Sequence, residues 1–411
     1  MLLRRLKAVA VLAALVLLVF LLRGNRWWPP PPTRVAPVRT GIDVLAADGF
    51  ALLAGKRVGL ITNQTGRTRD GRRTVDLLAA APEVKLVALF SPEHGMEGVR
   101  TGRVEDGADS ATGLRVYSLY GQTRRPTAEM LDGLDALVFD IQDAGVRYYT
   151  YVTTMGYAME EAARRGIEFV VLDRPNPLNG RAVEGPILDA DRLSFEGYFP
   201  LPLRHGMTLG ELARLFNREK KIGARLTVVP MAGWRREQWF DQTRLEWVNP
   251  SPNLRSLAGN TFYPAVELLR AGGVSVGRGT GTPFELFGAP WMEAEKLAGY
   301  LNQRGVPGVR FEPLRFRPTA DVHADQDCQG VRLLLADREV FDVGRLGVEL
   351  LAALHRFYPQ DFELAKSIRL LGSARTLARL EAGDDPKEIA TEWDEALAEF
   401  RELRAPYLLY D

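Results

Sequence analysis

Short apolar runs alternate with helical patterns through the first half of this chain. Each of four runs is short, continuous and rich in β-branched or aromatic residues, which is typical of a strand buried on both faces. These runs are residues 57–62, 85–91, 136–141 and 168–172. Helical periodicity fills the intervals at residues 74–81, 127–134 and 152–166. Because buried strands that alternate with helices form a parallel sheet with helices on both faces, the pattern predicts an α/β fold.

The alternation loosens beyond about residue 260. Before that point, a capping box at Thr208 opens a helix that reaches Asn217, and a strand follows at residues 226–229. The elements expected later are helices at 293–304 and 345–357, a strand at 331–336, and a final helix that Asp385 caps and in which Ile389, Trp393, Leu397 and Phe400 share one face. The sequence therefore predicts an α/β domain at 41–262 and a smaller α+β domain at 263–411.

The first 28 residues are typical of an export segment. A basic stretch at residues 2–7 precedes an unbroken apolar run of 15 residues, which is shorter than the roughly 20 residues of a spanning helix. No small-residue cleavage site follows, and the Trp27–Trp28 pair suits a membrane interface. We expect a signal anchor or signal peptide at 1–28, with the anchor preferred, and a Pro-rich linker at 29–40. The body would then lie in the cell envelope, held at the inner membrane by this segment.

Charge and composition exclude several classes of protein. Residues 1–39 carry seven basic side chains and no acidic one, so the rest of the chain has a net charge of −6. Nucleic-acid binding needs clustered positive charge, and we expect no nucleic-acid partner. With 46% hydrophobic and 26% charged residues, the chain is neither wholly disordered nor a multi-span membrane protein. Its single cysteine, Cys328, rules out an internal disulfide.

Polar residues gather where the four predicted strands end. Asn63 follows the first strand, and Glu93 and His94 follow the second. The third strand is followed by Asp140, Gln142, Asp143 and Arg147, and the fourth by Asp173, Arg174 and Asn176. Because ligands bind at this edge of open α/β sheets, we expect these groups to line one crevice.

Familiar cofactor and nucleophile motifs do not occur in the sequence. The first strand is followed by NQTGRTRDG rather than G-x-G-x-x-G, and there is no phosphate loop or G-x-S-x-G elbow. The four histidines show no paired metal-ligand spacing, so we expect neither a cofactor nor a catalytic metal.

Without these motifs, catalysis by carboxyl groups is the remaining possibility. Glycoside hydrolysis uses two carboxyl groups, one to protonate the leaving oxygen and one to activate water or attack the sugar. Tyr149 and other aromatic residues could contact a sugar face or pack in the core.

Several long strings of residues match one known family. They are FSPEHG (90–95), VYSLYG (116–121), FDIQDAGVRYYTY (139–151), VLDRPNPLNG (171–180), RHGMTLGELA (204–213), PSPN (250–253), GRGT (277–280), PFELFGAPW (283–291) and YLLY (407–410). By these strings the chain resembles the exo-β-N-acetylmuramidases of the NamZ type, over about residues 41–411.

The resemblance implies a fold, an activity and a set of site residues. It implies a Rossmann-like catalytic domain followed by a smaller C-terminal domain, and release of N-acetylmuramic acid from the non-reducing end of peptidoglycan fragments. Glu93 is the family's leading catalytic candidate and would act as general acid. Asp143 and Asp140 rank first for the second carboxylate, and retaining, inverting and substrate-assisted mechanisms stay open. We expect the substrate to be bound by Asn63, His94, Gln142, Arg147, Tyr149, Asp173, Arg174, Asn176, Arg204, His205, Asn253 and Arg278.

Two positions depart from the family pattern, which is acidic where this chain has Arg270 and Val276. These departures bear on the shape of the substrate site. Muramic acid carries a lactyl carboxylate, which a guanidinium can bind in two-pronged fashion. Candidates for that contact are Arg147, Arg174, Arg204 and Arg278. The alternatives to a glycosidase are a non-catalytic muropeptide-binding protein and a deacetylase or amidase, although the last class normally needs a metal or nucleophile motif.

Overall fold

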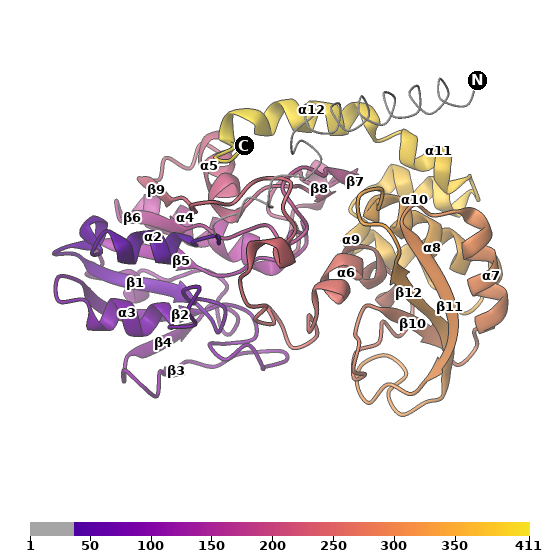
Figure 1. The fold of residues 1–411 in the computed structure, drawn as a ribbon, viewed down its shortest axis with the longest axis horizontal. Helices are drawn as coiled ribbons and strands as arrows, with labels where there is room; N and C mark the ends of the chain where they lie inside the picture. The colour runs from indigo at the N-terminus through magenta and orange to yellow at the C-terminus, as the bar shows by residue number, and fades with distance from the viewer. Residues whose placement is uncertain (1–36) are drawn as a thin grey trace, which may run out of the picture. The chain divides into compact units, whose positions relative to one another are not determined.

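A seven-stranded sheet forms the first part of this computed structural model, which describes residues 37–411. The strand order is β3-β4-β2-β1-β5-β6-β9, and all pairings are parallel except that of β3 with β4 (Figure 1). The strands are β1 (Arg57–Thr62), β2 (Lys85–Ser91), β3 (Gly107–Ala108), β4 (Arg115–Ser118), β5 (Ala136–Asp140), β6 (Glu168–Leu172) and β9 (Leu226–Val229). The predicted parallel sheet is confirmed.

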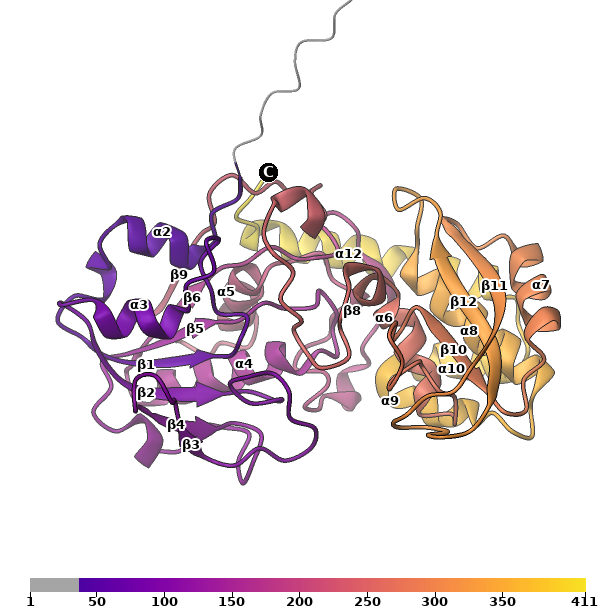
Figure 2. The ribbon, with the colours of Figure 1, turned by 60° about the horizontal axis from the view of Figure 1, so that its bottom comes forward.

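Helices cover both faces of this sheet, and β1 shows why. Its Val58 and Leu60 pack with residues of α2 (Gly41–Ala47) and α3 (Thr74–Ala80), whereas Ile61 belongs to a second cluster with residues of α4 (Thr150–Arg164) and α5 (Leu209–Glu219) (Figure 2). Successive side chains of a strand point to opposite faces, so a continuous apolar strand fills two cores. Thr208 caps α5 through the predicted capping box, because its side chain accepts a hydrogen bond from the Glu211 amide.

The second part of the structure is a smaller α+β unit, as expected. Its antiparallel sheet has the order β10-β12-β11 and is accompanied by long helices. These elements are α6 (Leu257–Arg270), β10 (Leu286–Ala289), α7 (Ala294–Arg304), β11 (Val309–Phe316), β12 (Cys328–Leu335) and α8 (Val343–Phe357). The predicted boundary at 262/263 falls inside α6, and it stays a prediction. A short antiparallel pair, β7 (Glu184–Ile187) with β8 (Pro202–Arg204), lies in the first part.

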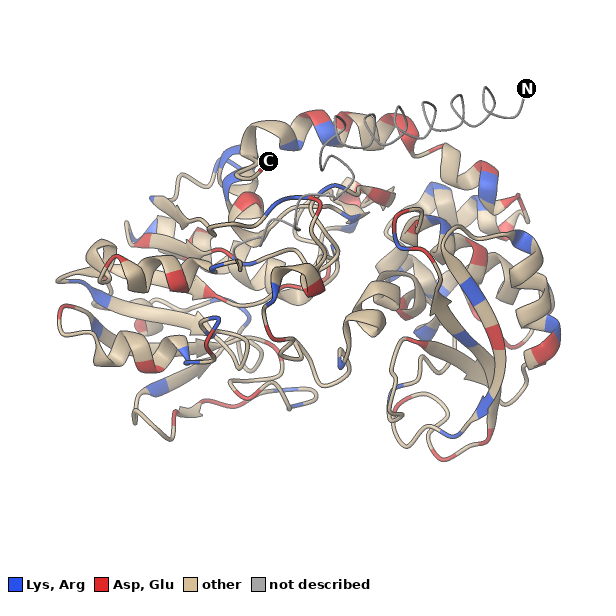
Figure 3. Ribbon diagram, viewed as in Figure 1, with Lys and Arg blue, Asp and Glu red and all other residues tan. Residues whose placement is uncertain are grey.

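The end of the chain returns to the parallel-sheet part. Helix α12 (Asp394–Arg404) runs back from the smaller unit, and the C-terminus lies beside α5 (Figure 1). Arg404 donates hydrogen bonds to the carbonyls of His205 and Gly206, and the Tyr410 hydroxyl donates to Asp173 at 2.6 Å. Acidic and basic positions lie side by side along α12 (Figure 3). The C-terminal segment therefore ties the two parts together.

Two predicted helices differ from the structure. Residues 127–134 form only a single 3₁₀ turn at Glu129–Leu131, because Gly133 takes a left-handed conformation that ends it. The final helix is divided into α11 (Pro386–Thr391) and α12. Trp393 stands at the division, where its indole donates a hydrogen bond to Thr376 of α10 (Ala374–Glu381).

The predicted signal segment at 1–28 and most of the predicted linker lie outside the described residues. Within residues 37–411, no helix has the length and apolar character needed to cross a membrane.

Candidate active site

Glu93 lies in an open cleft of about 200 Å³, called here the Glu93 cleft. One side comes from the loops that follow β2 and β5 and from the start of α4, and the other from α6 and the segment after it. The polar and aromatic groups that line it are Glu93, His94, Tyr120, Tyr148, Tyr149, Thr150, Glu196, Ser251, Asn253, Tyr263, Glu267, Arg270, Arg278, Phe284 and Arg369. The two parts of the structure therefore build this cleft together.

The Glu93 carboxylate is held at the beginning of α4. The Thr150 hydroxyl donates a hydrogen bond to Glu93 Oε2 at 2.6 Å. The Tyr120 side chain also interacts with the Glu93 carboxylate, which lines the open cleft where a substrate can reach it. Tyr120 lines the same cleft, and burial together with the nearby Glu93 charge raises the pKa of Tyr120 to about 12. The Tyr120 hydroxyl is therefore neutral near pH 7.

His94 lies in the same cleft as Glu93. An extended segment would direct adjacent side chains to opposite sides, but His94 has φ +74° and Gly95 has φ +75°, so the chain turns here. The His94 Nδ1 donates a hydrogen bond to the Arg100 carbonyl at 2.7 Å. Because a carbonyl can only accept, the neutral imidazole carries its proton on Nδ1 and its lone pair on Nε2.

Aromatic rings form one wall of the Glu93 cleft. Tyr149 packs edge-to-face against Tyr263, which packs in the same way against Phe284 with ring centroids 4.8 Å apart. Tyr148 completes the group, since its hydroxyl donates to the Tyr263 carbonyl at 2.9 Å. Tyr149 and Phe284 are 6% and 1% exposed, so these rings belong to the core as well as to the cleft.

Arginines paired with carboxylates lie beside these rings, since the Arg278 guanidinium is 5.4 Å from the centre of the Phe284 ring. Glu267 is 4% exposed and accepts hydrogen bonds from Arg270 Nε and Arg278 Nη2, both at 2.8 Å. Glu196 is paired with Arg369 through its Nε at 3.1 Å. Arg270, one of the two departures from the family pattern, thus faces the cleft, whereas Val276 is 1% exposed and packs in the core.

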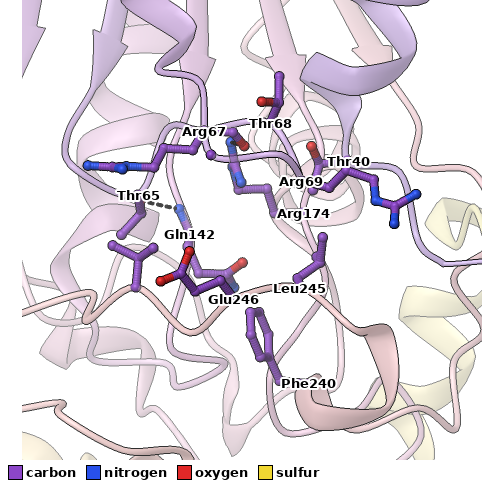
Figure 4. Close-up of a pocket in the computed structure, with 12 residues that line it drawn as sticks. Thr40, Thr65, Arg67, Thr68, Arg69, Gln142, Arg174, Phe240, Leu245 and Glu246 are labelled. Carbon is purple, nitrogen blue, oxygen red and sulfur yellow. Dashed lines mark hydrogen bonds between the residues drawn. The ribbon is translucent and has the colours of Figure 1, made fainter.

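A second cavity, called here the sheet-edge pocket, lies at the ends of β1 and β5. Figure 4 shows Thr65, Gln142 and Arg174 around it, and the backbone N–H of Gln142 donates to the Thr65 hydroxyl at 2.9 Å. Its volume is about 40 Å³, room for a few water molecules and too little for a sugar ring. The sheet-edge pocket and the Glu93 cleft share no lining residue, so they are two separate cavities. The strand ends do not converge on one crevice.

The two aspartates expected to supply a second carboxylate lie outside the Glu93 cleft. Asp140 is fully buried and accepts hydrogen bonds from Arg174 Nε at 2.6 Å, Arg174 Nη2 at 3.0 Å and the Thr74 hydroxyl. Asp143 is 5% exposed and accepts the Gly145 amide hydrogen at 2.7 Å. Burial raises the pKa of Asp143 to about 7. Both carboxyl groups organise the loops that follow β5 and β6.

Three of the four candidate arginines for the lactyl group are also occupied elsewhere. Arg147 is 1% exposed and donates to the carbonyls of Pro186, Leu201, Leu370 and Leu371. Arg204 is paired with Glu184 at 3.0 Å, and Arg174 with Asp140. Arg278 lines the Glu93 cleft.

The other predicted binding residues are buried, and their hydrogen bonds stabilise the loops around the site. The Asn63 side chain donates to the Tyr151 hydroxyl, and Asn176 donates to the Met207 carbonyl. Asp173 is fully buried and accepts from Thr208 at 2.7 Å as well as from Tyr410. His205 is fully buried, and burial lowers its pKa to about 3, so it is neutral.

Several cleft residues escaped the sequence-based expectation. Thr150 and Tyr120 lie within or beside the matched strings, but their types carry no catalytic pattern on their own. Glu196, Glu267 and Arg369 lie in segments without a motif, and only the fold brings them to Glu93. Among residues 37–411, no group of three or more His, Cys, Asp or Glu side chains has a geometry that could hold a metal ion.

An α/β domain that presents a carboxyl group, an imidazole and an aromatic wall in one open cleft has the groups that a glycosidase uses. Comparison with known protein families identifies the family to which this chain belongs. Residues 58–258 match the family described as Exo-beta-N-acetylmuramidase NamZ, N-terminal, and residues 261–410 match its C-terminal counterpart. The chain therefore belongs to the NamZ exo-β-N-acetylmuramidases, a family of glycosidases, as the resemblance of its sequence predicted.

Individual relatives agree with this assignment. The chain is 46% identical over 378 residues to the Peptidoglycan beta-N-acetylmuramidase NamZ of Bacillus subtilis (strain 168), covering 91% of each chain. A crystal structure of a DUF1343 family protein from Bacteroides fragilis NCTC 9343 is 39% identical with a TM-score of 0.86, and covers 92% of this chain and 100% of its own. A second DUF1343 structure from that organism is 30% identical with a TM-score of 0.76, covering 92% and 99%.

Proposed function

We propose that this chain is a glycosidase that releases N-acetylmuramic acid from the non-reducing end of peptidoglycan fragments, with Glu93 as the general acid. One observation carries the proposal: Glu93 lies in a cleft open to solvent, where the Thr150 hydroxyl holds one of its carboxyl oxygens. The name of the Bacillus subtilis relative, a peptidoglycan β-N-acetylmuramidase, supports the substrate class.

The geometry supports proton transfer by Glu93. A sugar bound against the tyrosine wall would bring its glycosidic oxygen toward Glu93 Oε1, and proton donation to that oxygen lets the aglycone leave as an alcohol. Thr150 holds the carboxyl group in one orientation, which reduces the entropy lost in reaching the reactive arrangement.

Incubation with a disaccharide that has N-acetylmuramic acid at its non-reducing end tests the proposal. We expect free N-acetylmuramic acid and the aglycone sugar as products, identified by mass spectrometry. Tight binding of the disaccharide without any cleavage would instead support the alternative, a non-catalytic muropeptide-binding protein.

We expect Arg278 to help select muramic acid over glucosamine. It is the candidate arginine that lines the Glu93 cleft, and its planar guanidinium can bind the lactyl carboxylate through two parallel hydrogen bonds, which lysine cannot reproduce. Hydrogen bonds to charged groups contribute about 1.5–3 kcal/mol, so Arg278→Lys should lower the preference for the muramyl substrate roughly 10–100-fold. The measurement is the ratio of kcat/KM for disaccharides with and without the lactyl group.

The control for Arg278→Lys is Arg270→Lys, because Arg270 pairs with the same Glu267 carboxylate. If Arg278→Lys keeps the selectivity of the natural protein, the lactyl group is recognised by other residues.

We also propose that residues 1–28 hold the protein at the inner membrane, on the outer side. The basic start, the apolar run of 15 residues and the missing cleavage site support this proposal. We expect the protein in the membrane fraction with its first residues intact, as measured by fractionation and N-terminal sequencing. A soluble exported protein that begins near residue 30 would show a cleaved signal peptide in place of an anchor.

A further inference from the structure

The cleft offers few groups that could assist Glu93. Hydrolysis needs a second group besides the acid, to activate water or to attack the sugar. Among the residues that the structure describes, three carboxylates line the Glu93 cleft: Glu93 itself, Glu196 and Glu267. Glu196 is paired with Arg369, and Glu267 is held between Arg270 and Arg278. Both carboxylates are therefore already engaged in ion pairs with guanidinium groups.

His94 offers a lone pair on a side chain that forms no ion pair. Glu267 Oε2 also has no hydrogen-bond partner, but it is buried, and the Oε1 of the same carboxylate accepts from two guanidinium groups. The His94 Nε2 forms no hydrogen bond with any of residues 37–411, and it is not enclosed. Two hydrogen bonds fix the ring and its loop: His94 Nδ1 donates to the Arg100 carbonyl at 2.7 Å, and the Arg100 amide donates to the His94 carbonyl at 3.2 Å. An imidazole whose Nδ1–H is held by an acceptor is oriented for proton uptake at Nε2.

The backbone at His94 has a left-handed conformation, which supports a functional role for this residue. A left-handed conformation is uncommon for residues other than glycine, although Asn, Asp and His tolerate it best. With φ +74° at His94, the loop brings two consecutive side chains, Glu93 and His94, into the same cleft. Backbone conformations of this kind cluster at functional sites.

We propose that His94 is the general base of the Glu93 cleft. This inference rests on the proposed function and specifies its mechanism. Glu93 donates its proton to the glycosidic oxygen, and the bond between that oxygen and C1 of the muramyl residue breaks. Water attacks C1 from the opposite face, and His94 Nε2 takes the proton that the water loses. The aglycone leaves as an alcohol, and one proton passes from imidazolium to Glu93 through solvent to reset the site. Direct attack by water inverts the anomeric centre.

The anomer of the released sugar tests this mechanism without any variant. A β-linked muramyl disaccharide should give the α anomer of N-acetylmuramic acid first, as followed by proton NMR within minutes of mixing, before the anomers equilibrate. A first product with the β configuration means retention through an attacking group, such as the acetamido oxygen of the substrate, and overturns the role of His94. In that case release of N-acetylmuramic acid still supports the proposed function, so the two failures are distinguishable.

Two substitutions test the residue itself. His94→Asn keeps the tolerance for the left-handed backbone and places an amide N–H where Nδ1 stands, but it has no basic nitrogen at the Nε2 position. We expect kcat to fall by about 10²–10⁴-fold, the usual contribution of general acid–base catalysis. His94→Gly suits the positive φ and leaves space, so added imidazole should restore part of the rate. A His94→Asn protein with near-normal kcat on the natural disaccharide overturns the proposal.

Discussion

Glu93→Gln should lower kcat on a natural muramyl disaccharide by about 10²–10⁴-fold, because the amide keeps the shape of the side chain and cannot donate an acidic proton. The Thr150 hydroxyl can still donate to the amide oxygen, so the loop should keep its conformation. Substrate binding should change little, and KM should reflect this. Substrates whose leaving group needs no protonation should recover part of the lost rate.

The matched control is Glu97→Gln. Glu97 belongs to the same turn as Glu93 but does not line the Glu93 cleft. The Glu97→Gln substitution removes one carboxylate from the same loop, so any general effect of charge on kcat should appear equally in both variants. Near-normal turnover by Glu93→Gln would show that another group protonates the leaving oxygen.

Asp140→Asn should destabilise the fold rather than abolish the chemistry. Asp140 is fully buried and forms a two-pronged ion pair with Arg174, whose side chain is 7% exposed. Removing one partner of a buried pair leaves the other charge without compensation, which typically costs about 3–5 kcal/mol. We expect a loss of this size in the free energy of unfolding, measured by chemical denaturation. The protein that remains folded should keep a kcat close to normal.

Asp135→Asn provides the comparison for Asp140→Asn. Asp135 pairs with Arg57 just before β5, and both side chains are about half exposed, 44% and 51%. Solvent screens such a pair, so this variant should unfold close to the natural protein. A stable Asp140→Asn protein that has lost turnover would restore Asp140 as the second catalytic carboxylate.

The strands of the parallel sheet could be predicted because their signal is local. Residues 58–61 and 169–172 carry no polar side chain and are buried at every position, as expected for strands covered on both faces. The helix expected at 127–134 was wrong because composition does not reveal the left-handed turn at Gly133. Local pattern identified the layers but not each connection.

The site could be predicted only in part, and the reason is topological. Glu93, His94, Tyr149, Asn253 and Arg278 were expected and lie together in one cleft. Gln142 and Arg174 were expected beside them but line the sheet-edge pocket. The sequence places all strand ends at one edge of the sheet, but it does not show that the residues there line two separate cavities.

The arginines illustrate the same limit. Arg147 and Arg204 lie inside matched strings as Arg278 does, and residue type alone cannot separate a ligand contact from a structural hydrogen bond. Arg147 donates to four backbone carbonyls, two of them in the smaller unit, which only the tertiary structure reveals. The burial of Arg147 and its hydrogen bonds to backbone carbonyls show that its role is structural.

Cleavage of two matched glycan fragments tests the exo-muramidase activity and the role of Glu93 in one experiment. The fragments differ only in whether N-acetylmuramic acid or N-acetylglucosamine occupies the non-reducing end, and the reaction is run in ¹⁸O-labelled water with mass analysis of early products. We expect the muramyl-terminated fragment alone to be shortened, by one sugar, with the label on the released N-acetylmuramic acid and with the reaction lost in Glu93→Gln. Shortening of the glucosaminyl-terminated fragment, or release of N-acetylmuramic acid by Glu93→Gln at an undiminished rate, would contradict the account.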